Sequence, residues 1–211
     1  MTLRERPEAS PASAANPSRR KSEMTRERLI LAAAKVVGQV GYETASSAKI
    51  AEEAGIAAGG LYYHFDNRRA LLNELLPTLG RQMVAYVVGR IHDMPWGLER
   101  EVASFEAYLD YLSEHPEFYR VFSEARVYAP QAYAVNFKAT LGDFEAALRV
   151  QRRKGFLKAQ EQDLALAAHF LTGIRNYVSQ LYMDADPPQS VPIAHAVRLY
   201  RQLLSEGLFR A

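Results

Sequence analysis

A run of polar aromatic side chains between two apolar residues is the strongest chemical signal in this sequence. Tyr62, Tyr63 and His64 lie between Leu61 and Phe65, which are four residues apart and therefore share one side of a helix. We expect the apolar pair to be buried and the three polar side chains to lie on the outer rim. Hydroxyl and imidazole groups placed there can donate hydrogen bonds to phosphate oxygens, a kind of contact that positions proteins on DNA.

The residues that must position this run predict two short helices joined by a turn. Ser46 or Ser47 can cap the first helix, and Gly55 supplies the left-handed backbone that ends it. The apolar stripe of this first helix is Ile50, Ala51 and Ala54. The second helix begins over 57–60 with no side chain larger than a methyl group, so its N-terminus can approach another backbone closely. This layout is that of a DNA-reading helix-turn-helix.

The combination resembles the TetR family of one-component bacterial transcriptional regulators. The matching residues are Ile50-Ala51, Ala54-Gly55-Ile56 and Leu61-Tyr62-Tyr63-His64-Phe65, with further matches over 25–34, at Gly41-Tyr42 and over 67–72. The resemblance implies an all-α protein, in which a three-helix DNA-binding domain precedes a larger helical domain that binds a small, often lipophilic ligand and forms a dimer. The side chains and glycines expected at the DNA are Ser46, Ser47, Lys49, Gly59, Gly60, Tyr62, Tyr63, His64 and Arg68.

The second helix departs from the family pattern. Ala57, Ala58 and Gly60 stand where the family often has hydroxyl or basic side chains, so few groups are left to hydrogen bond to base edges. We therefore expect affinity to depend on phosphate contacts and on apolar contact with thymine methyl groups. The alternative is a helical ligand-binding or interaction protein whose DNA binding has weakened. Salt-dependent binding to duplex DNA distinguishes the two.

Length and charge agree with one small and one larger helical domain. The chain has 211 residues, of which 48% are hydrophobic and 24% charged, and strand signals are nearly absent. Residues 1–69 hold 11 Lys or Arg against 8 Asp or Glu, whereas residues 70–211 hold 15 against 16. We expect a disordered basic arm over 1–21, a DNA-binding domain over 22–67, and a ligand-binding and dimerisation domain over 68–211, whose linking helix is 68–91.

Two segments that flank the DNA-binding domain each allow two interpretations. The arm 1–21 ends with Arg19-Arg20-Lys21, which either extends into the minor groove or is part of a solvated linker. The linking helix contains Pro77, which should kink it. That kink either serves the connection between the two domains or follows the shape of the core.

Apolar periodicity and Pro or Gly breaks predict the remaining helices. A helix near 25–40 begins the DNA-binding domain, and later helices lie near 98–113, 117–128, 131–154, 163–183 and 193–209. The basic run 152–154 either complements a helix dipole or binds nucleic acid. We expect the helices 163–183 and 193–209 to form a four-helix bundle with the same helices of a second subunit. The alternative is that both helices are buried within the monomer.

The second half of the chain is rich in aromatic residues that suggest a ligand pocket. The residues expected to line it are Phe105, Tyr108, Phe122, Tyr133, Phe137, Phe170, Arg175 and Tyr177. Arg175 lies in an otherwise apolar helix, and a buried guanidinium needs an anionic partner. Candidate partners are Glu106, Asp110 or the head group of an acidic or acyl ligand, with an intramolecular pair favoured.

The sequence lacks the residues that several classes of functional site require. The chain has no cysteine, which excludes disulfides and thiolate chemistry, and its five histidines show no metal-binding spacing. No Gly-rich phosphate loop or nucleophile elbow is present, so we expect no catalytic residues, no metal and no cofactor. The longest mostly apolar stretch, 164–174, is too short to span a bilayer. The expectation is a cytoplasmic homodimer, a repressor that binds a palindromic operator and is released by a small, lipophilic ligand.

Overall fold

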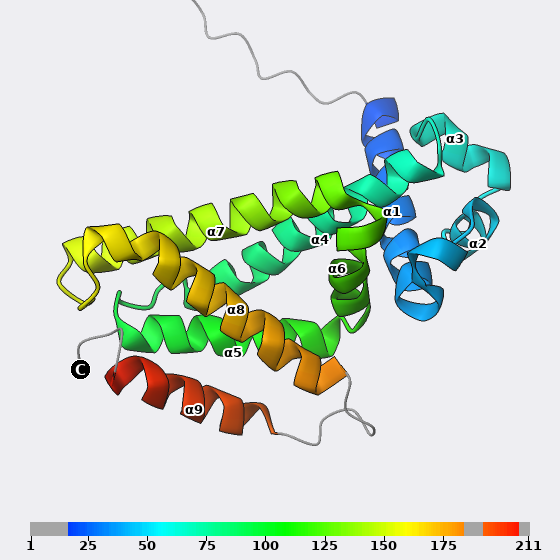
Figure 1. Cartoon of the computed structure of the whole chain (residues 1–211). Coiled ribbons are helices and arrows are strands. Elements are labelled where there is room, and N and C mark those ends of the chain that lie inside the picture. Colours follow the sequence, from blue (N-terminus) through cyan, green and yellow to red (C-terminus); the bar gives the residue numbers. More distant parts are fainter. Residues whose placement is uncertain (1–16, 184–191, 207–211) are drawn as a thin grey trace, which may run out of the picture.

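The computed structural model describes residues 17–183 and 192–206, and all regular elements in these ranges are helices (Figure 1). The α-helices are α1 (Pro17–Thr44), α2 (Ser47–Glu53), α3 (Leu61–His64), α4 (Arg68–Ile91), α5 (Leu98–Glu114), α6 (Glu117–Tyr128), α7 (Pro130–Arg153), α8 (Leu164–Met183) and α9 (Ile193–Glu206). Two short 3-10 helices, η1 (Ala58–Gly60) and η2 (Glu161–Asp163), precede α3 and α8. The expected all-α class is confirmed. Among the residues so described, no helix combines the length and apolar character that a membrane crossing requires.

The first helix begins earlier than the sequence suggested. Pro17 lies at its start, and Arg19 forms an ion pair with Glu23 at 3.1 Å, one helical turn further on. The prediction of a disordered arm is therefore wrong for residues 17–21, and residues 1–16 lie outside the described part. Near its other end, Gly41 has a φ of 80° and breaks the regular helix before the last residues of α1.

The helix-turn-helix forms with a shorter second helix than expected. Ser46 caps α2, because its hydroxyl accepts a hydrogen bond from the Lys49 N–H at 3.2 Å. The segment expected to open the second helix instead forms η1 without a side-chain cap at Ala57, and α3 spans only Leu61–His64. Two adjacent glycines, which each cost about 1 kcal/mol in a helix relative to Ala, account for this weak start.

The C-terminal helices pack around α5. This helix buries Val102, Phe105, Leu109 and Leu112 and contacts α4, α8 and α9, while α7 and α8 form a hairpin that also contacts α4 and α6 (Figure 1). The hairpin is tied near its turn, where Glu161 accepts hydrogen bonds from Arg149 at 3.0 Å and Arg152 at 3.2 Å. The helix α4 continues through Pro77 as a single element.

The N-terminal helices contact the rest of the protein mainly through α1 and α6. The two helices approach so closely that a Cβ atom added to Gly38 would lie 2.6 Å from the Cβ atom of Glu117. A side chain at position 38 would therefore push α6 away. This contact places α6 between α1 and the C-terminal helices.

Candidate nucleic-acid face and ligand cavity

The alternation of buried and exposed side chains in α3 agrees with the sequence pattern. Leu61 and Phe65 are 0% and 4% exposed, whereas Tyr62 and Tyr63 are 55% and 82% exposed. His64 is half-buried, with the Tyr63 ring edge-on to it at 5.1 Å. The exposed side chains of Ser46, Lys49, Tyr62 and Tyr63 are called the reading face below.

A hydrogen bond connects α3 to α2. The Tyr62 hydroxyl donates to the Ser47 hydroxyl oxygen at 3.2 Å, so one tyrosine of α3 is connected to the first turn of α2. Between them, Gly59 is surrounded by open space, and a Cβ on Gly60 would meet the Ile56 side chain at 3.3 Å. The turn thus tolerates little extra volume at Gly60.

Arg68 has a structural role that the sequence did not reveal. Its guanidinium donates hydrogen bonds to the backbone carbonyls of Tyr42, Glu43 and Ala45, at the end of α1. These carbonyls lack helical partners because α1 ends there. These bonds occupy the Nε and Nη2 atoms of Arg68, and its assignment as a phosphate contact stays a prediction. The next residue, Arg69, is exposed and has no ion-pair partner among the described residues, so it is the better candidate for that contact.

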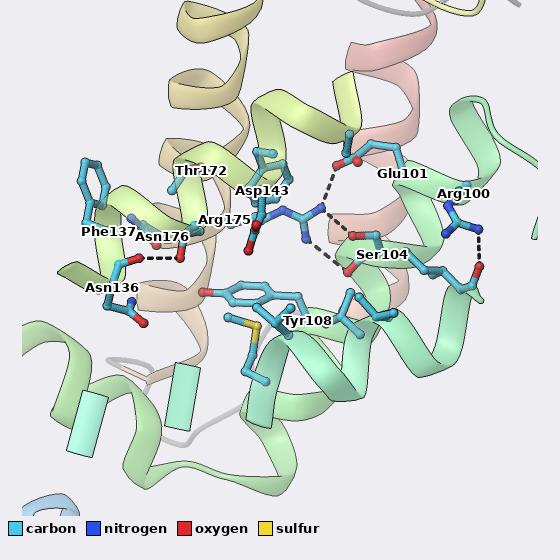
Figure 2. A pocket seen from close by; sticks show the side chains of 18 of the residues that line it. Arg100, Glu101, Ser104, Tyr108, Asn136, Phe137, Asp143, Thr172, Arg175 and Asn176 are labelled. Atoms are coloured by element: carbon cyan, nitrogen blue, oxygen red, sulfur yellow. Dashed lines mark hydrogen bonds and ion pairs between the residues drawn. The ribbon is translucent and has the colours of Figure 1, made fainter. Parts of the chain in front are cut away.

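A cavity of about 260 Å³ lies among α4, α5, α6, α7 and α8 (Figure 2). Four of the residues expected to line a pocket do so: Tyr108, Phe122, Phe137 and Arg175. The sequence missed the polar side chains of its wall, which are Arg100, Glu101, Ser104, Asn136, Thr140, Asp143, Gln151, Thr172 and Asn176. It also missed Trp96 and the aliphatic residues that α4 contributes, which are Met83, Val84, Val87, Val88 and Ile91.

The other four expected residues do not line the cavity. Phe105 is fully buried behind it, with its ring 4.2 Å from that of Tyr200. Tyr133 stacks on Phe137 at 5.8 Å without reaching the cavity wall. Phe170 and Tyr177 are 63% and 73% exposed, because they lie on the outer side of α8.

The buried Arg175 is paired within the protein. Its Nη2 atom donates to Glu101 Oε1 at 2.7 Å and to Ser104 Oγ at 3.1 Å, and its Nη1 atom donates to the Ser104 carbonyl at 3.2 Å. An intramolecular pair is therefore confirmed, but the partner is Glu101 and neither Glu106 nor Asp110. One helical turn separates Glu101 from Ser104, which lets α5 present both groups to α8.

Tyr200 completes this buried cluster from α9. Its hydroxyl donates to Glu101 Oε1 at 2.7 Å. Burial, and after it the charge of Glu101, raises the pKa of this hydroxyl well above its ordinary value. Tyr200 therefore stays protonated and donates, and Glu101 is held between a guanidinium and a phenol.

The helix α6 reaches both the cavity and α1. Phe118 and Phe122 line the cavity. From the same helix, Arg120 donates to the Gln39 carbonyl at 3.0 Å, and Glu124 accepts the Tyr42 N–H at 2.8 Å. Arg120 and Glu124 also pair with each other at 2.7 Å. A displacement of α6 by a bound molecule would therefore act directly on α1.

Comparison with protein families gives a match in the N-terminal helices. A family model described as bacterial regulatory proteins of the tetR family matches residues 29–75. The HTH-type transcriptional regulator BetI of Vibrio parahaemolyticus is 29% identical over 73 residues, which cover 35% of this chain and 37% of that protein. The HTH-type transcriptional activator FasR of Mycolicibacterium smegmatis is 28% identical over 135 residues, covering 64% of this chain and 62% of that protein. The matched segments thus span less than two thirds of each relative.

Solved structures share the fold over most of their length. The fatty acid degradation regulator FadR from Bacillus halodurans has a TM-score of 0.75 at 22% identity and covers 91% of this chain and 96% of its own. FadR from Bacillus subtilis in complex with stearoyl-CoA has a TM-score of 0.74 at 22% identity. The match covers 86% of this chain and 98% of that FadR chain. A transcriptional regulator from Saccharomonospora viridis in complex with choline has a TM-score of 0.74 at 16% identity. The match covers 90% of this chain and 100% of that regulator.

Proposed function

We propose that this chain is a regulator of the TetR family, a repressor that binds duplex DNA and is released by a small ligand. The observation that carries the proposal is the reading face. Tyr62 and Tyr63 are exposed directly beside the buried Leu61, on a helix anchored to a capped α2. Exposed hydroxyls and a lysine on two connected helices suit contact with phosphates.

The outer sides of α8 and α9 support binding as a dimer. Large apolar side chains at least 55% exposed lie on them: Leu166, Phe170, Tyr177, Leu181, Leu199 and Leu203. Soluble monomers seldom leave so many large apolar groups in water, and a twofold contact between subunits would bury them. Such a dimer presents two reading faces, which fits a palindromic operator. Residues 207–209 of the last predicted helix lie outside the described part.

The cavity and α6 support release by a ligand. The cavity wall is largely apolar with a few polar groups, which is typical of a site for a small lipophilic molecule. Phe118 and Phe122 would touch such a molecule, and α6 holds α1 through Arg120 and Glu124. A ligand that binds only one position of α6 shifts the population of DNA-binding arrangements.

Salt-dependent binding tests this function against a helical ligand-binding protein with weakened DNA contact, the alternative that the short α3 favours. Affinity for a random-sequence duplex is measured by fluorescence anisotropy over a series of salt concentrations. A DNA-binding regulator loses affinity steeply as salt rises, because each neutralised phosphate contributes about 0.9 to the slope of log affinity against log salt. Absent or salt-independent binding by a protein that circular dichroism shows to be folded would favour the alternative.

A further inference from the structure

We infer that the cavity takes a small apolar molecule with an uncharged head group that both donates and accepts hydrogen bonds, a primary amide or an alcohol. The inference rests on the proposed function only for the expectation that the cavity has a ligand. It excludes a carboxylate head group and a coenzyme A ester.

The charges of the wall do not suit an anion. Arg175 is 4% exposed and already paired with Glu101, which is 7% exposed, so a carboxylate that accepted from its free Nε–H would share the guanidinium with a second buried carboxylate. Arg100 donates to the Met94 carbonyl at 2.6 Å, and its guanidinium lies 4.6 Å from the centre of the Trp96 ring. Both guanidiniums of the wall thus already donate to acceptors of the protein, Arg175 to a carboxylate and Arg100 to a backbone carbonyl, and an entering anion would compete with these acceptors.

Three buried polar atoms of the wall lack a hydrogen-bond partner in the described part of the chain. They are Thr172 Oγ1, Gln151 Oε1 and Arg175 Nε, and their residues are 6%, 2% and 4% exposed. The amide oxygen can only accept, the guanidinium N–H can only donate, and the hydroxyl can do both. Buried polar atoms of this kind usually have partners. A head group that pairs with both Gln151 Oε1 and Arg175 Nε must donate to the first and accept from the second.

The same atoms exclude a purely cationic head group. An ammonium could donate to Gln151 but would leave Arg175 Nε without an acceptor, and it would lie close to a guanidinium. Asp143 is exposed, so its charge is solvated by water and needs no partner from a ligand. Asn136, Thr172 and Asn176 gather beside Phe137 on one wall, which adds two uncharged amides to this polar region (Figure 2).

The rest of the wall and the volume define the body of the molecule. Val84, Val87, Phe118, Phe122 and Phe144 provide an apolar surface on three helices. The volume of about 260 Å³ lies just under the range of about 300–1,000 Å³ that is usual for sites of drug-sized molecules. A short alkyl or aryl group fits this space, whereas a coenzyme A group does not.

A series of eight-carbon probes with different head groups tests the inference. Trp96 is the only tryptophan of the chain and lines the cavity, so its fluorescence reports binding without DNA. Octanamide, octan-1-ol, octanoate and octylammonium are titrated at neutral pH. We expect octanamide and octan-1-ol to bind about tenfold or more tightly than the two charged probes, by analogy with the cost of an unpaired buried charge. Tighter binding of octanoate or octylammonium, or no binding of any probe, would overturn the inference.

Two substitutions sharpen the test. Thr172→Val keeps the shape but removes the unpaired hydroxyl, and we expect it to weaken octanamide binding about fivefold to tenfold. The matched control is Thr140→Val, because the Thr140 hydroxyl also lines the cavity but already donates to the Asn136 carbonyl at 3.0 Å. Its octanamide affinity should change by less than about twofold. Equal losses in both variants would contradict the role of the unpaired hydroxyl.

A charge substitution tests separately whether the Glu101–Arg175 pair disfavours an anionic head group. Glu101→Gln leaves Arg175 without its counter-charge, and we expect octanoate then to bind more tightly than octanamide. Unchanged selectivity in the folded variant would show that the pair does not disfavour an anionic head group. If this variant does not fold, the probe series on the unmodified protein still shows whether neutral head groups bind more tightly than charged ones. Failure of the proposed function is a different result, since DNA binding can be lost while the probe selectivity remains.

Discussion

At the scale of single residues, two basic side chains of the DNA-binding helices differ in their contacts. Lys49 is exposed and has no ion-pair partner in the described residues, whereas Arg68 is tied to the carbonyls at the end of α1. Residue type alone does not separate them. The difference depends on where α1 ends, which brings its unpaired carbonyls to the start of α4.

These roles predict different consequences of substitution. Lys49→Gln should reduce the slope of log affinity against log salt by about two for a dimer that places one lysine on each half-site, with unchanged stability. Arg68→Met should instead lower the free energy of unfolding by about 2 kcal/mol, because it leaves backbone carbonyls without donors. Salt titrations and urea denaturation measure the two effects. A stable Arg68→Met variant with a reduced slope of log affinity against log salt would show that Arg68 contacts a phosphate.

At the scale of elements, the sequence predicts helices better than it predicts which side of a helix faces the cavity. Helix α6 has the bounds that the sequence predicted, and α5 differs by one residue, since Pro and Gly breaks end them. The start of α3 was missed because two glycines weaken it.

The pocket prediction for α8 contained a conflict that geometry could have revealed. Phe170 and Arg175 are five residues apart, which places them about 140° apart around a helix, so both could not face one cavity. The structure turns Thr172, Arg175 and Asn176 inward and leaves Phe170 and Tyr177 outside. Which of the two faces is buried depends on packing against α5 and α7, and the sequence of α8 alone does not specify it.

The contact between α6 and α1 leads to a prediction for this pair of helices. Arg120→Met removes the hydrogen bonds to the Gly38 and Gln39 carbonyls, so hydrogen exchange of the α1 amides should become about tenfold faster. Arg126→Met is the matched control, because Arg126 is exposed on the same helix and has no ion-pair partner among the described residues. Equal exchange in the two variants would mean that α6 does not restrain α1.

At the scale of the whole molecule, the outward apolar side chains of α8 and α9 predict the assembly. Phe170→Glu places a charge in the proposed contact, and we expect it to weaken dimerisation about a hundredfold or more without unfolding the subunit. Val135→Glu is the matched control, since Val135 is 63% exposed on α7. Light scattering over a concentration series measures both variants. A Phe170→Glu variant that remains dimeric would show that the interface lies elsewhere.

The central claim is that two reading faces of one dimer bind one operator. The most direct test is selection of random duplex DNA by the full-length protein at moderate salt, followed by sequencing of the bound fraction. We expect enrichment of a palindrome with half-sites about one helical turn apart, and loss of that enrichment in Phe170→Glu. A folded, dimeric protein that enriches no sequence would contradict the claim and favour a ligand-binding protein with weakened DNA contact.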